Sequence, residues 1–147
     1  MFIDPDDTFE LDACENLYRE IEKTQADYVI ANYRNMDEDD TKWKKPAFDT
    51  KKYQEMQVSI EESSKSFYVM NSGVWNKIFR KKFLDKIEVK FIEKVPAEDA
   101  IFTTYCFIKA EKVYYTPEVV YNYRLRQSDS ISSSCSKEYF LGINRAY

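Results

Sequence analysis

The chain has 147 residues, enough for one domain with a buried core, and combines 44% hydrophobic with 33% charged residues. Its net charge of -4 argues against a general nucleic-acid binder, which would carry an excess of basic residues. The sequence has no histidine and two glycines, which excludes histidine catalysis, histidine-ligated zinc and a glycine-rich phosphate loop. Any catalysis must therefore use carboxylates, hydroxyls, lysine or arginine.

The three cysteines, Cys14, Cys106 and Cys135, are odd in number and lack metal-ligand spacing. They are typical of reduced thiols in a cytosolic protein. No apolar run reaches the length of a membrane span, and no signal-peptide pattern is visible. We therefore expect a cytoplasmic protein without a membrane span.

The first seven residues run from apolar side chains into three carboxylates, Asp4, Asp6 and Asp7. This pattern is typical of the end of a buried strand, where ligands bind in open α/β sheets. Carboxylates this close repel one another unless a cation lies between them, and their oxygens suit Mg²⁺ or Mn²⁺. Alternatively, Asp7 or Thr8 caps the following helix, with Asp4 and Asp6 in a solvated turn. These residues alone leave both interpretations open.

Hydrophobic spacing predicts a helix from Asp7 or Thr8 to about Thr24 and a strand at 26–33. Residues 35–56 are polar with mixed charge, which indicates a surface excursion. The later segments are, in order, a strand or turn at 74–79, a basic helical turn at 80–84, a strand at 89–92, a helix opened by 96–99 with Phe102, Tyr105, Cys106 and Lys109 on its buried face, strands at 113–115 and 119–123, a loop at 124–134 and a terminal helix at 136–147.

Five motifs stand in a fixed order along nearly the whole chain, at 2–7, 26–30, 74–84, 98–102, and 121–126 with 130–132. Each motif alone is weak. Their order resembles family 2 glycosyltransferases of the GT-A fold: the DXD region, the next strand, the segment before the acceptor site, the "ED" motif and the Tyr-Arg…Ser-Ile-Ser ending.

This resemblance implies an α/β fold, with residues 1–147 as the later part of a GT-A domain: a mixed sheet flanked by helices, without the amino-terminal nucleotide-binding half. We expect such a chain to be inactive alone and to self-associate through an exposed sheet edge. The implied reaction is inverting and metal-dependent. It moves a sugar from a nucleotide-diphosphate sugar to a saccharide or lipid-linked saccharide acceptor, in cell-surface polysaccharide synthesis in the cytoplasm or at the inner membrane face.

The resemblance also implies a role for each matching residue. Asp99 is the expected general base, because a sugar hydroxyl needs a carboxylate to take its proton. The negative charge that grows on the leaving diphosphate must be balanced by a metal ion or an arginine. The remaining roles are donor binding by Asp4, Arg124 and Arg126, metal binding by Asp6 and Asp7, and the acceptor or sugar pocket for Trp75 and Glu98.

Structural roles are the alternatives at these positions. Glu98 and Asp99 also suit the positive end of a helix dipole. Arg124 and Arg126 also suit surface ion pairs, and Trp75 a core position.

Two other functions compete with sugar transfer. Residues 4–8 fit the Asp-x-Asp-x-Thr signature of haloacid dehalogenase-like phosphotransferases, in which Asp4 would attack phosphorus and Asp6 would handle protons. That interpretation leaves 74–84 and 121–132 unexplained. The other alternative is a non-catalytic remnant or interaction module, which predicts no turnover with any donor.

Overall fold

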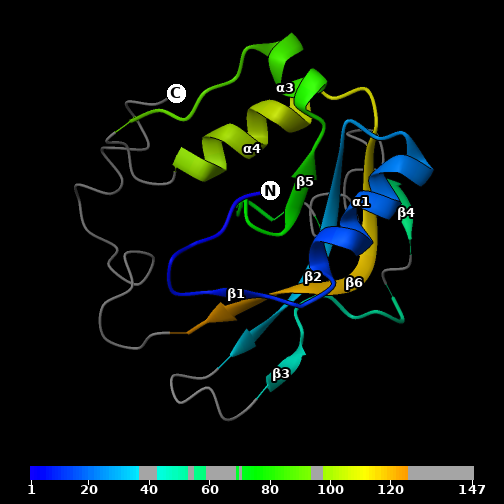
Figure 1. The fold of residues 1–147 in the computed structure, drawn as a ribbon, viewed down its shortest axis with the longest axis vertical. Helices are drawn as coiled ribbons and strands as arrows, with labels where there is room; N and C mark the ends of the chain where they lie inside the picture. The colour runs from blue at the N-terminus through cyan, green and yellow to red at the C-terminus, as the bar shows by residue number, and fades with distance from the viewer. Residues whose placement is uncertain (37–42, 53–54, 59–68, 70, 94–97, 126–147) are drawn as a thin grey trace.

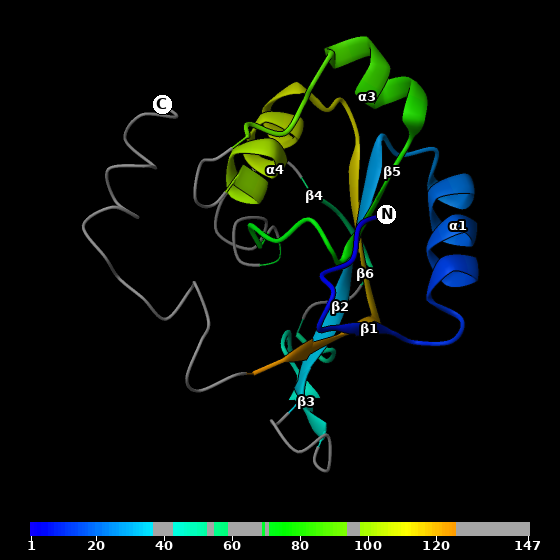
Figure 2. The same cartoon turned by 60° about the vertical axis from the view of Figure 1, so that its left-hand side comes forward.

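A computed structural model describes residues 1–36, 43–52, 55–58, 69, 71–93 and 98–125. Within these residues a six-stranded mixed sheet lies between helices (Figure 1). Helix α1 (Ala13–Thr24) covers one face, α4 (Glu98–Lys109) lies over the other, and α3 (Lys81–Ile87) lies at the end of the sheet (Figure 2), where its Phe83 packs with the cluster under α4. The predicted α/β class, with a mixed sheet flanked by helices, is confirmed.

The centre of the sheet is a parallel pair, β2 (Tyr28–Met36) and β6 (Val113–Arg124). The other strands pair antiparallel along the outer edges of this pair: β5 (Lys77–Phe79) and β3 (Trp43–Pro46) on β2, and β4 (Met56–Val58) and β1 (Thr8–Phe9) on β6. The strand predicted at 26–33 corresponds to β2, and the segments at 74–79 and 80–84 correspond to β5 and the start of α3.

Strand β2 separates two hydrophobic clusters because successive side chains point to opposite faces of a sheet. Tyr28 and Ile30 pack with the side chains from α3 and α4. Val29 and Ala31 pack with α1, whose apolar stripe includes Leu17. The alternation of one strand thus holds the helices on both faces.

The beginning of the chain differs from the prediction. Residues 1–4 form no strand, and Thr8 and Phe9 pair with β6 opposite Asn122 and Tyr121 instead of opening a helix. Helix α1 begins at Ala13, although it ends at Thr24 as predicted. The predicted cap is also wrong, because the carboxylate of Asp7 accepts hydrogen bonds from β6 rather than from a helix.

Residues 89–92 form no strand either. The ring of Phe91 instead stacks on Phe102 of α4, with centroids 4.3 Å apart. On α4, Phe102 and Cys106 are buried as predicted, together with Thr103 and Phe107. The prediction was wrong for two positions of that face, since Tyr105 and Lys109 are exposed.

The two strands predicted at 113–115 and 119–123 are one strand, β6, with an irregularity between them. Thr116 pairs with Ala31 and Val119 with Asn32, so Pro117 lies outside the regular ladder. Proline has no N–H to donate and is tolerated at such a bulge. The break between the two predicted segments therefore marks a bulge within one strand.

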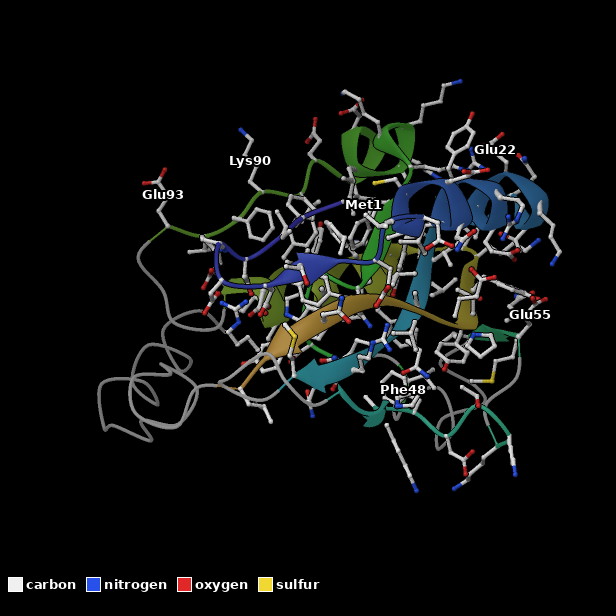
Figure 3. The ribbon with its side chains drawn as sticks, turned by 60° about the horizontal axis from the view of Figure 1, so that its bottom comes forward. Met1, Glu22, Phe48, Glu55, Lys90 and Glu93 are labelled. Carbon is white, nitrogen blue, oxygen red and sulfur yellow. The ribbon has the colours of Figure 1, made fainter. Side chains whose placement is uncertain are left out.

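Part of the predicted surface excursion at 35–56 belongs to the core. Phe48 is buried beside β2 (Figure 3), where the side-chain amide of Asn32 bonds its backbone N–H and C=O at 3.1 and 2.9 Å. The terminal helix, the loop beyond Leu125 and the helix-opening Pro96 lie outside the described residues. Of the helices that the structure describes, none has both the length and the hydrophobicity for a membrane crossing.

Candidate active site

Asp7 attaches the acidic segment 4–7 to the end of β6. Its two carboxylate oxygens accept the backbone N–H of Arg124 and the hydroxyl of Tyr121, each at 2.8 Å. The same hydroxyl accepts the N–H of Asp4 at 3.1 Å. Burial raises the pKa of Asp7, and these two donors oppose that increase. Asp7 therefore fixes the backbone of the segment that carries Asp4 and Asp6.

Asp99 occupies the first turn of α4. Its carboxylate is half-buried and accepts the N–H of Ala100 at 2.7 Å. Burial raises the pKa of Asp99, the negative charge of Glu98 adds to the increase, and the Ala100 N–H and the positive charge of Lys77 oppose it. A carboxylate with a raised pKa is a better proton acceptor near neutral pH.

The two acidic groups, far apart in the sequence, lie close together in the fold. Burial raises the pKa of Asp4, and the charges of Asp7 and Asp6 raise it further. The charges of Asp99 and Glu98 add to the same increase, so segment 4–7 and the start of α4 share one electrostatic environment. Phe2 explains this approach: its ring packs edge-on against Phe102 of α4, at 5.8 Å between centroids, and in Figure 1 the dark-blue start of the chain lies beside α4 and β5.

Trp75 and the arginines lie in different environments. Trp75 is 8% exposed, and its ring stacks on those of Tyr121 and Tyr123, with centroids 4.5 and 5.5 Å apart. It is therefore part of the core, and its predicted pocket role stays a prediction. The positive charge of Arg124 lowers the pKa of Asp7, which indicates that the guanidinium lies near the acidic segment. Arg126 lies outside the described residues, and Glu98 is exposed.

The fold of this chain occurs in solved structures of a known protein. The chain aligns over 99% of its length with the crystal structure of S. aureus TarS 1–349 in complex with UDP-GlcNAc, with a TM-score of 0.75 and 17% identity. It aligns equally far with a longer TarS structure, with a TM-score of 0.70 and 16% identity. This chain shares its fold with part of TarS.

A sequence relative agrees with the TarS match. Glycosyltransferase GlyA of Streptococcus pneumoniae serotype 4 is 28% identical over 134 residues, which are 86% of this chain. The resemblance to glycosyltransferases is thereby confirmed. No family model matches the chain. The chain spans 19% of the length of GlyA, and 40% and 23% of the two TarS chains.

The acidic segment fits a divalent cation in its chemistry. Carboxylate oxygens are the donors that Mg²⁺ and Mn²⁺ prefer, and the repulsion at Asp4 is what a cation would relieve. Asp7 fits this role less well than Asp4 and Asp6, because both of its oxygens already accept hydrogen bonds. Within the described ranges no three acidic or thiol side chains form a ready-made ion site, so a bound cation would need ligands from elsewhere, such as a diphosphate.

Lys77 is the residue at this site that sequence reasoning missed. Its side chain is fully buried, and its ammonium donates to the carbonyls of Asn71 (2.9 Å) and Gly73 and to the side-chain oxygen of Asn76 (2.9 Å). Burial lowers its pKa to about 7, and the charge of Asp99 opposes that decrease. The available signal was a lysine inside the apolar run 74–79, where a charged side chain needs partners.

Proposed function

We propose that this chain carries the catalytic carboxylates of a family 2 glycosyltransferase that transfers a sugar from a nucleotide-diphosphate sugar to an acceptor hydroxyl. One observation carries the proposal: Asp99 and Glu98 lie within electrostatic range of Asp4, in a fold shared with TarS. The reaction needs a carboxylate beside the acceptor to take its proton, and a cation, which carboxylates can hold, beside the diphosphate. The proposal assigns the first role to the start of α4 and the second to segment 4–7.

Asp99 is the proposed general base. The acceptor hydroxyl oxygen attacks the anomeric carbon, the bond from that carbon to the diphosphate oxygen breaks, and the hydroxyl proton passes to the Asp99 carboxylate. Attack opposite the leaving group inverts the anomeric configuration. The raised pKa of Asp99 supports this role, because a carboxylate at its ordinary pKa is a weak base at neutral pH. Glu98, exposed beside it, is proposed to contact the acceptor.

The diphosphate leaves with growing negative charge, which must be matched by cations. Arg124 lies near the acidic segment, and Arg126 follows it in the sequence, so both are proposed to face the diphosphate. A Mg²⁺ or Mn²⁺ ion held by Asp6 and Asp4 would supply further positive charge to the same group. Asp7 orients the segment through its bonds to β6.

The substrate class is proposed from the same comparisons. TarS has been crystallised with UDP-GlcNAc and with UDP, which supports a nucleotide-linked sugar as the donor for this chain. The acceptor is proposed to be a saccharide or lipid-linked saccharide of cell-surface polysaccharide assembly, presented in the cytoplasm or at the inner membrane face.

Substitution of Asp99 tests the proposal. In the full natural protein, Asp99→Asn should lower the transfer rate by about 100- to 10,000-fold, the usual contribution of a general base, with donor affinity nearly unchanged. Asp85→Asn is the matched control, because Asp85 is an exposed carboxylate of α3 paired with Lys81 at 2.7 Å. The rate is measured as release of the nucleotide diphosphate, and donor affinity by calorimetry.

Two results would count against this assignment. Full transfer by Asp99→Asn would remove the base role, and loss of donor binding would make Asp99 a binding residue instead. Hydrolysis of a simple phosphate ester that Asp4→Asn abolishes would favour the phosphotransferase alternative.

A further inference from the structure

Lys77 organises the loop 71–76. An ammonium has three N–H donors, and all three acceptors of Lys77 belong to this loop: the carbonyls of Asn71 and Gly73 and the side chain of Asn76. Asn76 in turn donates to the carbonyl of Ala31 in β2 at 2.7 Å. The loop is thus wrapped around one buried positive charge and fastened to the central sheet.

The loop also contacts the helix turn that carries Asp99. The hydroxyl of Thr103 lies 2.8 Å from the carbonyl of Ser72 and 2.9 Å from the carbonyl of Asp99. Thr103 is buried, and one helical turn separates it from Asp99. The backbone that Lys77 holds therefore packs directly against the first turn of α4.

The same loop reaches the acidic segment on its other side. Trp75 stacks on Tyr121, whose hydroxyl bonds both Asp7 and the backbone of Asp4. The loop around Lys77 is therefore in contact with elements that position both groups of carboxylates.

We propose that Lys77 is a positioning residue for sugar transfer: it holds loop 71–76 against α4 and places a buried positive charge within range of the Asp99 carboxylate. This inference rests on the proposed function, since Asp99 is its target. A buried ammonium is costly, and an apolar side chain would fill the same space more cheaply, so packing alone does not account for a lysine here. The charged or titratable groups that influence Lys77 are Asp99 and Cys106, and those that influence Asp99 include Glu98 and Lys77.

The test removes the positive charge of Lys77 and keeps an unbranched side chain of similar length. In Lys77→Met the pKa of Asp99, measured by NMR of ¹³C-labelled aspartate, should rise because the positive charge that lowers it is gone. In the full natural protein kcat should fall by about 10- to 100-fold, with KM for the donor little changed, and the acidic limb of the pH–rate profile should move to higher pH. Lys112→Met is the matched control, because the ammonium of Lys112 also donates to a backbone carbonyl, that of Thr24 at 2.6 Å, and is not among the main influences on the pKa of Asp99.

An unchanged Asp99 titration in Lys77→Met would overturn the inference, as would an equal shift in Lys112→Met. Should Lys77→Met not fold, the reciprocal variant decides: in Asp99→Asn the pKa of Lys77 should fall below its wild-type value, and an unchanged pKa overturns the coupling. These titrations need no turnover. Absence of transfer by the wild-type protein, with the titrations coupled, would therefore refute the proposed function and leave the Lys77–Asp99 pair in place.

Discussion

The geometry of the acidic segment depends on one oxygen atom, the hydroxyl oxygen of Tyr121. Tyr121→Phe removes that atom and leaves the ring stacked on Trp75 and edge-on to Phe9, 5.2 Å away. Because burial raises the pKa of Tyr121, the hydroxyl stays protonated and donates to Asp7 at every working pH. The substitution therefore isolates one hydrogen bond to a buried carboxylate and one acceptor for the N–H of Asp4.

The expected loss follows from the charge on the acceptor. A hydrogen bond to a charged group contributes about 1.5 to 3 kcal/mol to stability, more than a neutral one. Asp7 keeps its bond from Arg124, and Asp4 is exposed enough for water to replace its lost acceptor. We therefore expect the free energy of unfolding to fall by about 2 kcal/mol in Tyr121→Phe.

Urea unfolding followed by circular dichroism measures this change. Tyr123→Phe is the matched control, because Tyr123 stacks on the same Trp75 and its hydroxyl is not part of the bonds at Asp7. That variant should stay within about 0.5 kcal/mol of the wild type. Equal midpoints for the two variants would refute the reasoning, since the hydroxyl of Tyr121 would then contribute no more than that of a half-exposed tyrosine.

Two further predictions concern Gly73 and Asp99. A Cβ at Gly73 would lie 2.6 Å from Cε2 and Nε1 of Trp75, so Gly73→Ala should lower the free energy of unfolding by about 1 to 3 kcal/mol and change the near-ultraviolet circular dichroism. The control Ser72→Ala, at an exposed neighbouring position, should change neither. A normal spectrum and stability for Gly73→Ala would contradict the packing. The raised pKa of Asp99 means that the folded state binds its proton more tightly than the unfolded chain, so its contribution to stability is complete below the ordinary pKa and falls as pH rises through the raised value. Asp99→Asn should accordingly melt at a higher temperature than the wild type at neutral pH and at the same temperature in acid, and the reverse order in calorimetric scans would contradict the sign.

Local patterns predicted the elements whose type follows from the hydrophobic spacing of their own residues. The spacing of Leu17 and Ile21 predicts the stripe of α1, and the β-branched and aromatic run 26–33 predicts β2. The errors fall where a distant residue decides. Neither a helix cap nor a cation site at Asp7 predicts its partners, Tyr121 and Arg124, because these residues stand more than a hundred positions later in the chain.

The candidate site also has a part that the sequence predicted and a part that only the fold shows. The order of motifs led to Asp99 and the acidic segment, and the fold brings these carboxylates into one electrostatic environment. Periodicity alone contained no such information, because the contact of Phe2 with Phe102 that brings them together is long-range. The sequence signal at Lys77 was a charged residue inside the run 74–79, but its acceptors could not be predicted, since the carbonyls of Asn71 and Gly73 converge on the ammonium only when loop 71–76 has folded.

These features share one physical cause. Asp4, Asp7 and Asp99 all have a raised pKa, because burial at Asp7 and partial loss of water at Asp4 and Asp99 disfavour the charged carboxylate. The increase in pKa is opposed at Asp7 by two hydrogen-bond donors and at Asp99 by the positive charge of Lys77. Both compensations meet at Trp75, which joins the loop around Lys77 to the ring of Tyr121. The segment 71–77 therefore matters to the site through what it supports, and its buried residues, Gly73 to Lys77, are expected to tolerate substitution less well than the exposed Ser72.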